Sequence, residues 1–269
     1  MKIKIIVDNN VAQSSVFAEH GFSALICDGG KNILFDTASG SLALLHNLEC
    51  FKVSTEEISD VVLSHGHNDH SGGVVTLMNR SQACKFWAGE GFDMARTGRR
   101  GVDIGLKLTA EQKSRFNIVD GMVKLTEDVF AVSAKGCELT ELSHTDDFYI
   151  LTDDGATPRD YFTDEVYIIC VHGGKMSIIT GCAHRGVSNI VRQAQSLFRL
   201  PVDTIIGGFH TLHDSREKLE RLASELKSAS PRQIICGHCT GVDAYATLKT
   251  MMPEIEMMHT QVGMNVFCE

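Results

Sequence analysis

The amino-acid sequence predicts an α/β fold built in layers, and three observations lead to this prediction. Apolar runs of strand length alternate along the chain with stretches that have helical spacing. Three of the later runs end at a candidate site residue, which is typical of strands that meet at one edge of a sheet. The hydrophobic content of 43% in 269 residues is enough for a core, in one domain or two.

The expected elements of the N-terminal part are two strands and a helix. Residues 1–7 (MKIKIIV) and 61–63 (VVL) are apolar enough for strands, the second of them short and buried. Between these strands, residues 53–60 have the signature of a capped helix, because Ser54 can act as the N-cap and Glu57 follows three residues later.

Further elements are expected in the rest of the chain. Residues 72–78 predict a helix behind the segment at 63–73, and residues 219–228 have the apolar spacing of an amphipathic surface helix. No internal repeat or low-complexity tract is present. Later apolar runs predict strands at 166–171, 176–180, 204–206 and 233–236.

Residues 63–73, LSHGHNDHSGG, contain three imidazoles and one carboxylate within six positions. Imidazole and carboxylate are ligands suited to zinc, iron or manganese. Because the segment follows a strand, His65 and His67 can aim at one point, while Asp69 and His70 can diverge toward a second. We therefore expect parts of two metal sites here. The alternative is a polar turn that happens to be rich in histidine.

The pattern His-x-His-x-Asp-His resembles the signature of the metallo-β-lactamase superfamily. Other segments are similar to one branch of it, which is named for the dihydropterin–ribofuranosylaminobenzene 5′-phosphate synthases. The resemblance covers nearly the whole chain and is weakest at 84–164. It is carried by residues 19–26, 33–37, 65–70, 178–191, 207–210 and 236–241.

The resemblance implies a four-layer αββα sandwich, in which two sheets pack face to face, helices lie outside, and metals bind at one edge between the sheets. It also implies a single domain over residues 1–269, with an insertion at the active site around 84–164. One departure occurs at Ala38, where the family motif Asp-Thr-Gly has glycine. Because alanine has a Cβ, a positive φ there would be strained, and we expect a small local adjustment.

The resemblance further implies two divalent metal ions, with zinc as the first expectation and manganese or iron as alternatives. His184, after the strand at 176–180, would complete the first set of ligands. His238, after the strand at 233–236, would complete the second. The six expected ligands are His65, His67, Asp69, His70, His184 and His238.

Cys182 competes with His184 as a ligand, because other branches place a bridging aspartate near this position. A thiolate would bind zinc well, although a small buried side chain is the favoured interpretation. Without a bridging aspartate, the second site could be loose, or one metal could be held tightly. His210 is expected to be the general acid or a substrate contact, with metal ligation as a lesser alternative. Asp36 either orients a ligand or anchors the structure. Five histidines stay unassigned: His20, His144, His172, His213 and His259.

The expected activity is metal-dependent hydrolysis of a small anionic substrate, a phosphate ester or anhydride in the first place, by a metal-bound hydroxide. Asp69 would hold the hydroxide in line, and His210 would protonate the leaving group. Three alternatives stay open. The branch resemblance implies a transferase that joins a pterin pyrophosphate to a ribosylated aminobenzene phosphate and releases pyrophosphate. The site could instead support metal-based redox chemistry, or belong to a non-catalytic ligand-binding protein.

Charge and composition limit the kinds of partner and the location that we expect for this protein. A formal charge of −9 disfavours broad nucleic-acid binding, and the apolar runs are too short to span a membrane. With no secretory signal, a cytoplasmic location and reduced cysteines are expected. Within residues 89–126, basic side chains could grip a phosphorylated substrate or could be ordinary solvated charges. These are Arg96, Arg99, Arg100, Lys107, Lys113 and Arg115.

Overall fold

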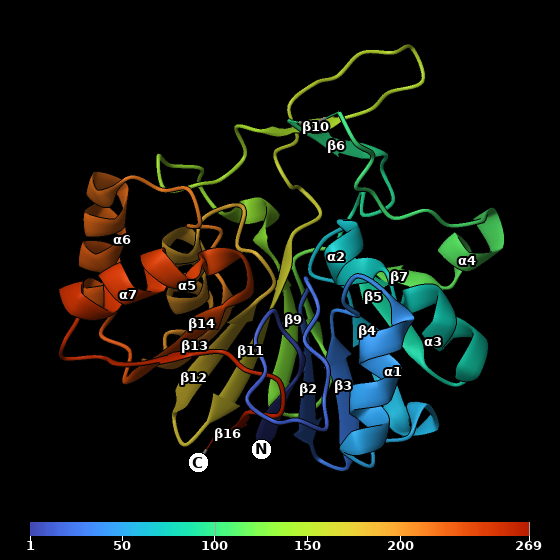
Figure 1. Ribbon diagram of the computed structural model, residues 1–269, viewed down its shortest axis with the longest axis horizontal. Helices are drawn as coiled ribbons and strands as arrows, with labels where there is room; N and C mark the ends of the chain where they lie inside the picture. The colour runs from blue at the N-terminus through green and yellow to red at the C-terminus, as the bar shows by residue number, and fades with distance from the viewer. Residues whose placement is uncertain (100, 269) are drawn as a thin grey trace.

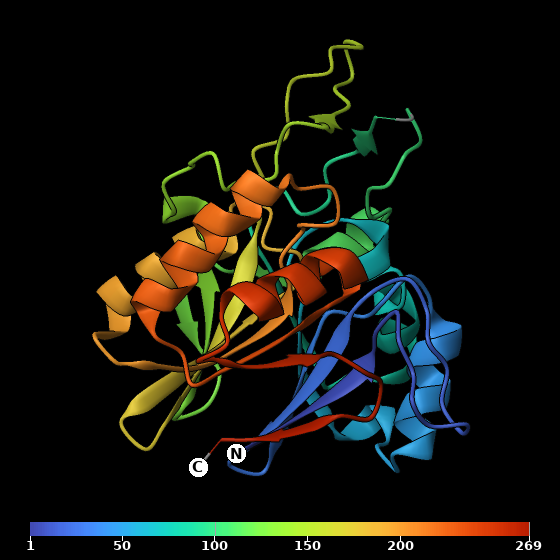
Figure 2. The ribbon, with the colours of Figure 1, turned by 60° about the vertical axis from the view of Figure 1, so that its left-hand side comes forward.

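The strands of the computed structural model form two sheets that pack face to face, with helices over both outer surfaces (Figure 1). The structure describes residues 1–99 and 101–268, and within these ranges each large sheet has seven strands. The expected four-layer αββα sandwich is therefore confirmed. A small pair of strands, β6 (Arg96–Gly98) and β10 (Phe148–Ile150), projects above the sheets (Figures 1 and 2).

Each large sheet mixes antiparallel strands with a parallel block. In spatial order the first sheet consists of β16 (Asn265–Phe267), β1 (Lys2–Val7), β2 (Ser23–Asp28), β3 (Lys31–Phe35), β4 (Ile58–Val62), β5 (Lys85–Ala88) and β7 (Phe116–Ile118). The second sheet consists of β15 (Glu256–His259), β14 (Gln233–Gly237), β13 (Val202–Gly208), β12 (Lys175–Thr180), β11 (Val166–His172), β9 (Val129–Ser133) and β8 (Met122–Lys124). Strands β3, β4, β5 and β7 of the first sheet run parallel to one another, and so do β12 to β15 of the second.

The helices divide between the two outer layers (Figure 1). Beside the first sheet lie α1 (Ser41–Cys50), α3 (Val74–Arg80) and α4 (Ala110–Ser114). Beside the second lie α5 (Val187–Phe198), α6 (Arg216–Ala229) and α7 (Val242–Met251). The remaining turns are α2 (Asn68–Ser71), η1 (Thr55–Glu57), η2 (Ala134–Gly136) and η3 (His238–Thr240). No helix in the described part of the chain is long and apolar enough to cross a membrane.

The apolar core has three parts, one between the sheets and one beneath each helix layer. Strand β13 is buried at every position, because the facing sheet covers one side and helices cover the other. In β1, Ile3 and Ile5 face the second sheet, whereas Ile6 belongs to the core under α1 and α3. The strand predicted at 204–206 is present within β13 and is covered on both faces.

The capped helix predicted for residues 53–60 is wrong in its extent. Ser54 and Glu57 form the expected capping box, but the helix is the single turn η1. The chain then enters β4, where Ile58 is buried and the strand pairs with β3 and β5. Burial of apolar side chains in the sheet outweighs continuation of the helix, since helix propensity is a weak preference. The helices predicted at 72–78 and 219–228 are present as α3 and α6.

Residues 84–164 divide between the sheets and the surface above them. Strands β5 and β7 extend the first sheet, and β8 and β9 extend the second. Much of the remainder lies around β6 and β10, above the edge at which the parallel strands end (Figure 2). We call this part the cap, and it comprises residues 94–99, 101–106 and 138–163.

Arg96 fastens the cap to the segment at 63–73. The guanidinium is 1% exposed, and its Nε donates to Asp160 at 2.6 Å. A second nitrogen forms an ion pair with Asp164 at 2.8 Å, and the other oxygen of that carboxylate accepts from the amide of Gly66 at 2.9 Å. Gly66 leaves no room for a side chain, because a Cβ would lie 2.2 Å from the Arg96 guanidinium.

The basic residues of the 89–126 stretch are mostly engaged within the protein. Arg96 is enclosed by carboxylates and is not available to grip a phosphate, which corrects that expectation for this residue. Arg99 pairs with Asp147, Lys107 with Asp103 and Lys113 with Asp93, while Arg115 donates to the carbonyl oxygens of Met78 and Ser81. Arg100 lies outside the described residues.

Replacing Arg96 should destabilise the fold strongly. In Arg96→Met, Asp160 and Asp164 would stay buried without their cation, and breaking a buried ion pair costs about 3–5 kcal/mol of unfolding free energy. Urea denaturation of the variant measures this loss. The matched control is Arg99→Met, which removes an exposed arginine–aspartate pair and should change stability little. Equal effects of the two substitutions would contradict the structural role of Arg96.

Candidate metal centre

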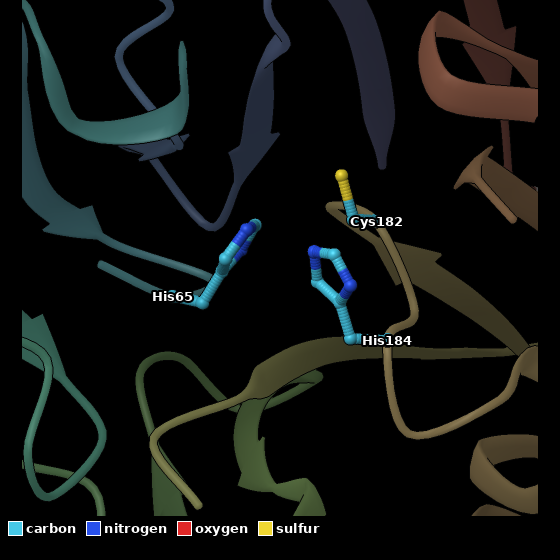
Figure 3. Close-up of side chains that lie close together, drawn as sticks. All are labelled: His65, Cys182 and His184. Carbon is cyan, nitrogen blue, oxygen red and sulfur yellow. The ribbon is translucent and has the colours of Figure 1, made fainter. Parts of the chain in front are cut away.

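The side chains that the sequence singled out meet where parallel strands of both sheets end. The segment at 63–73 follows β4 in the first sheet. Cys182 and His184 follow β12 and His238 follows β14, in the second sheet. Because parallel strands share the same carboxyl edge, these loops face each other across the gap between the sheets. Figure 3 shows the His65 ring pointing toward His184 and Cys182 from the opposite side.

His65, His67 and His184 form the first group. Their ring centroids lie 4.6 Å (His65–His67), 4.9 Å (His65–His184) and 5.1 Å (His67–His184) apart. The Nε2 atoms of all three are buried and have no hydrogen-bond partner among the described residues. An unsatisfied buried polar atom costs about 1–3 kcal/mol, and three of them in neighbouring imidazole rings indicate a cation site.

Hydrogen bonds fix the tautomer of two of these rings. Ser64 Oγ donates to Asp36 at 2.7 Å, so it accepts the contact of 2.8 Å from His65 Nδ1. His184 Nδ1 donates to the carbonyl oxygen of His144 at 3.2 Å. The proton of each ring is therefore on Nδ1, which leaves a lone pair on Nε2. This arrangement, with the second ring nitrogen donating to a protein oxygen, is the one in which histidine binds metals.

Asp69, His70 and His238 form the second group. His70 Nε2 lies 3.1 Å from His238 Nε2, and Asp69 Oδ2 lies 3.6 and 3.4 Å from these two nitrogens. His70 Nδ1 donates to Asp36 at 2.7 Å, and His238 Nδ1 donates to Asn9 Oδ1 at 3.1 Å. Here too both Nδ1 atoms are donors, and the Nε2 atoms face each other and a carboxylate.

The two groups differ in charge. Burial lowers the pKa of His67 to about 3 and holds the pKa values of His65 and His184 well below the usual value, so these rings are neutral. Burial also acts on His70, but Asp69 and Asp36 outweigh it and raise the pKa of His70 to about 9. The first group therefore presents neutral imidazole ligands, and the second stabilises positive charge.

Cys182 lies between the two groups. Its Sγ is 3.1 Å from His70 Nε2, and it falls within 4.8 Å of the ligand atoms of His65 and His184 as well as those of His70 and His238. The thiol is buried, as the sequence interpretation favoured, but it stands beside imidazoles from both groups. The donor atoms therefore fit one or two ions of the kind that takes nitrogen, oxygen and sulfur ligands.

Asp36 touches both groups through one buried carboxylate. Oδ1 accepts from the Ser64 amide at 2.6 Å, and Oδ2 accepts from Ser64 Oγ and His70 Nδ1, both at 2.7 Å. Of the two roles left open, orientation of ligands is the one that these contacts support. Ala38 has φ +57°, so the strain expected from alanine at this position is present, and the turn is kept.

His210 and two unassigned histidines also lie at the centre. The His210 ring is 4.3 Å from that of His184, and its Nδ1 is buried without a partner among the described residues. His144 Nε2 lies 2.9 Å from Asp214, and His20 Nε2 lies 3.4 Å from Asp69. Sequence reasoning missed His20 and His144, although His20 falls within a segment that carried the resemblance. His213 and His259 line the same pocket, whereas His172 is on β11 and contacts Ser177.

The centre opens into a pocket of about 1230 Å³ between the cap, the 63–73 segment and the loops of the second sheet. Its polar side includes Arg99 and Lys218, which pair with Asp147 and Asp214. Its apolar side is made by Val102, Ile104, Phe148, Leu212 and Val242. A ligand here would meet metal-binding side chains at the base and apolar surface at the wall.

Removing the Asp36 carboxylate should weaken metal binding without unfolding the protein. Asp36→Asn loses an acceptor for His70 and Ser64, and loss of such an outer contact lowers metal affinity about 10–100-fold. Competition with a chromophoric chelator measures the affinity. The matched control is Asp60→Asn, an equally buried carboxylate of the first sheet that accepts from Trp87. Unchanged zinc affinity in Asp36→Asn, or an equal loss in both variants, would contradict the orienting role.

Comparison with known proteins agrees with this architecture. The family model described as the metallo-beta-lactamase superfamily matches residues 17–159. An uncharacterized protein of Methanocaldococcus jannaschii is 31% identical over 253 residues, which cover 93% of this chain and 94% of that protein. A 7,8-dihydropterin-6-methyl-4-(β-D-ribofuranosyl)-aminobenzene-5′-phosphate synthase of the same organism is 27% identical over 266 residues, covering 91% and 89%.

Solved structures share the fold. A metal-dependent hydrolase of the β-lactamase superfamily superimposes with a TM-score of 0.88 at 24% identity, covering 100% of this chain and 99% of that one. Zinc-bound PqqB of Methylobacterium extorquens superimposes with a TM-score of 0.59 at 12% identity, covering 99% and 100%. The chain belongs to the metallo-β-lactamase superfamily.

Proposed function

We propose that this protein is a metal-dependent hydrolase of a small anionic substrate, and that the substrate is a phosphate ester or anhydride. One observation carries the proposal. Three buried imidazole nitrogens without partners face a second group of two histidines and an aspartate, at the base of an open pocket. The chain belongs to a superfamily whose members typically bind metals, and this membership supports the same interpretation.

The proposed ligands are those that the sequence indicated. His65, His67 and His184 hold one ion, and Asp69, His70 and His238 hold the other. Cys182 is within reach of both positions. Zinc suits this set of nitrogen, oxygen and sulfur donors better than a hard ion that prefers oxygen alone. Bound divalent ions would lower the pKa of a water molecule and neutralise charge on the attacked group.

His210 is the proposed proton donor to the leaving group. Its ring stands beside His184 and faces the pocket, so it can reach a substrate held at the first group. The backbone amide of His210 donates to Cys239 Sγ at 3.3 Å, and the residue has φ +55°. The backbone therefore fixes where the ring lies. The apolar wall around Phe148 and Leu212 would accommodate the organic part of the leaving group.

A second candidate is the transferase reaction of the pterin synthase relative, in which pyrophosphate leaves. Its support is the similarity to that relative over 91% of this chain, together with the size of the pocket. Small-molecule sites commonly have volumes of about 300–1,000 Å³, so this pocket has room for two reactants. Incubation with both substrates of the synthase separates the candidates, because only a transferase forms the coupled product.

The hydrolase proposal predicts phosphoester cleavage that depends on the first group. Protein loaded with zinc or manganese should hydrolyse p-nitrophenyl phosphate or its diester. His67→Ala should lower kcat/KM at least about 100-fold, since the centre supplies the electrostatic stabilisation. His46→Ala is the matched control, because His46 is a half-buried histidine on α1, outside the centre. Cleavage at equal rates by His67→Ala would overturn the proposal, and ligand binding without turnover would favour a non-catalytic protein.

Replacing the proton donor should affect poor leaving groups most. A general acid contributes about 10²–10⁴-fold to rate, so His210→Gln should lower kcat by that order for an alkyl phosphate. The loss should be much smaller for p-nitrophenyl phosphate, whose leaving group needs little protonation, and the metal held by His65, His67 and His184 should stay unchanged. An equal loss with both substrates would exclude the role of His210 as general acid.

A further inference from the structure

Two thiols and an imidazole form a third group beside the centre. The ligand atoms of Cys182, His210 and Cys239 all lie within 4.8 Å of one another. Each residue comes from a different strand end, since Cys182 follows β12, His210 follows β13 and Cys239 follows β14. Both thiols are buried, and His210 Nδ1 has no partner among the described residues. Of these three residues, the hydrolytic role proposed above needs only His210.

The backbone at or next to each of these three residues adopts a conformation that costs energy. Ala183, His210 and His238 have φ values of +54°, +55° and +48°, in the left-handed region that disfavours side chains with a Cβ. Each is one of the three residues or its chain neighbour. Strained conformations of this kind cost about 1–3 kcal/mol each and concentrate at functional sites. Three of them at three adjacent strand ends place the thiols and the imidazole together.

Close packing, and not the chance position of loose loops, holds the two thiols near each other. A Cβ on Gly208 would lie 2.5 Å from Cys239 Sγ and 3.4 Å from Cys182 Cα, so glycine is needed between them. Cys239 Sγ also accepts from the His210 amide at 3.3 Å and lies 3.8 Å from the carbonyl oxygen of Cys182. The position of Cys239 is thus defined from both sides.

We propose that Cys182, His210 and Cys239 form a separate metal position that takes a thiophilic ion, such as Cd²⁺ or Zn²⁺. Two sulfurs and one imidazole nitrogen form a softer donor set than the histidines and aspartate beside it, so this position selects ions by softness. On binding, each thiol releases its proton to solvent and the thiolate takes the ion. Because Cys182 is shared with the neighbouring groups, occupation of this position draws that sulfur away from them.

The test counts sulfur ligands on a bound ion. Reduced, metal-stripped protein is titrated with Cd²⁺, and binding is followed by thiolate-to-metal charge-transfer absorption and by X-ray absorption spectroscopy. The parent protein should show two sulfurs on one ion. Cys239→Ser should show one sulfur and bind Cd²⁺ at least about tenfold more weakly. Cys84→Ser, which removes a buried thiol outside the centre, should behave as the parent protein.

Two further variants keep the outcome decisive. His210→Gln should keep both sulfurs and weaken binding, because only the nitrogen ligand is removed. His67→Ala breaks the first histidine group and should leave the two-sulfur signature intact, which separates this proposal from the hydrolase proposal. One sulfur in both the parent protein and Cys239→Ser would mean that Cys182 binds with the histidines alone, and would overturn the third position. An absence of sulfur ligation in the parent protein would overturn it equally.

Discussion

The carboxylate of Asp36 accepts hydrogen bonds from both sides of the metal centre at once. Through Ser64 it sets the tautomer of His65, and directly it sets that of His70. It is buried, and the group that balances its charge is His70, whose pKa it helps to raise and whose Nδ1 lies 2.7 Å away. A Cβ on Gly181, in the opposite sheet, would lie 2.9 Å from the same carboxylate. This contact couples the ends of the two sheets to the orientation of the ligands.

The centre is built from the ends of strands and not from a single motif. The 63–73 segment supplies four of the proposed ligands, but their ligand atoms would face an empty gap without the loops after β12 and β14. The strained turns at Ala183 and His238 direct those loops inward, and the core between the sheets supplies the stability that keeps them there. The Arg96 cluster holds the cap against the same segment, so the pocket and the metal ligands share one support.

Much of the fold and of the metal centre could be predicted from sequence, because these features depend on local sequence patterns. The density of histidines at 65–70 indicated metal ligation, and the apolar runs before Cys182 and His238 indicated strands that end at the site. What sequence could not supply is the relation between distant segments. His20 and His144 reach the centre through contacts across the fold, Cys182 falls between both groups, and Arg96 is drawn into a buried ion cluster. The prediction of a helix at 53–60 was wrong because the pairing of β4 with its neighbours decides the conformation after Glu57.

Metal content of protein purified without chelators tests the account most directly, beside His67→Ala and His238→Ala. The account predicts about two equivalents of zinc, manganese or iron in the parent protein. Each variant should lose about one equivalent, because each substitution removes a ligand from a different group. One equivalent in the parent protein, lost in His67→Ala and kept in His238→Ala, would contradict the two-ion centre and the role given to His238.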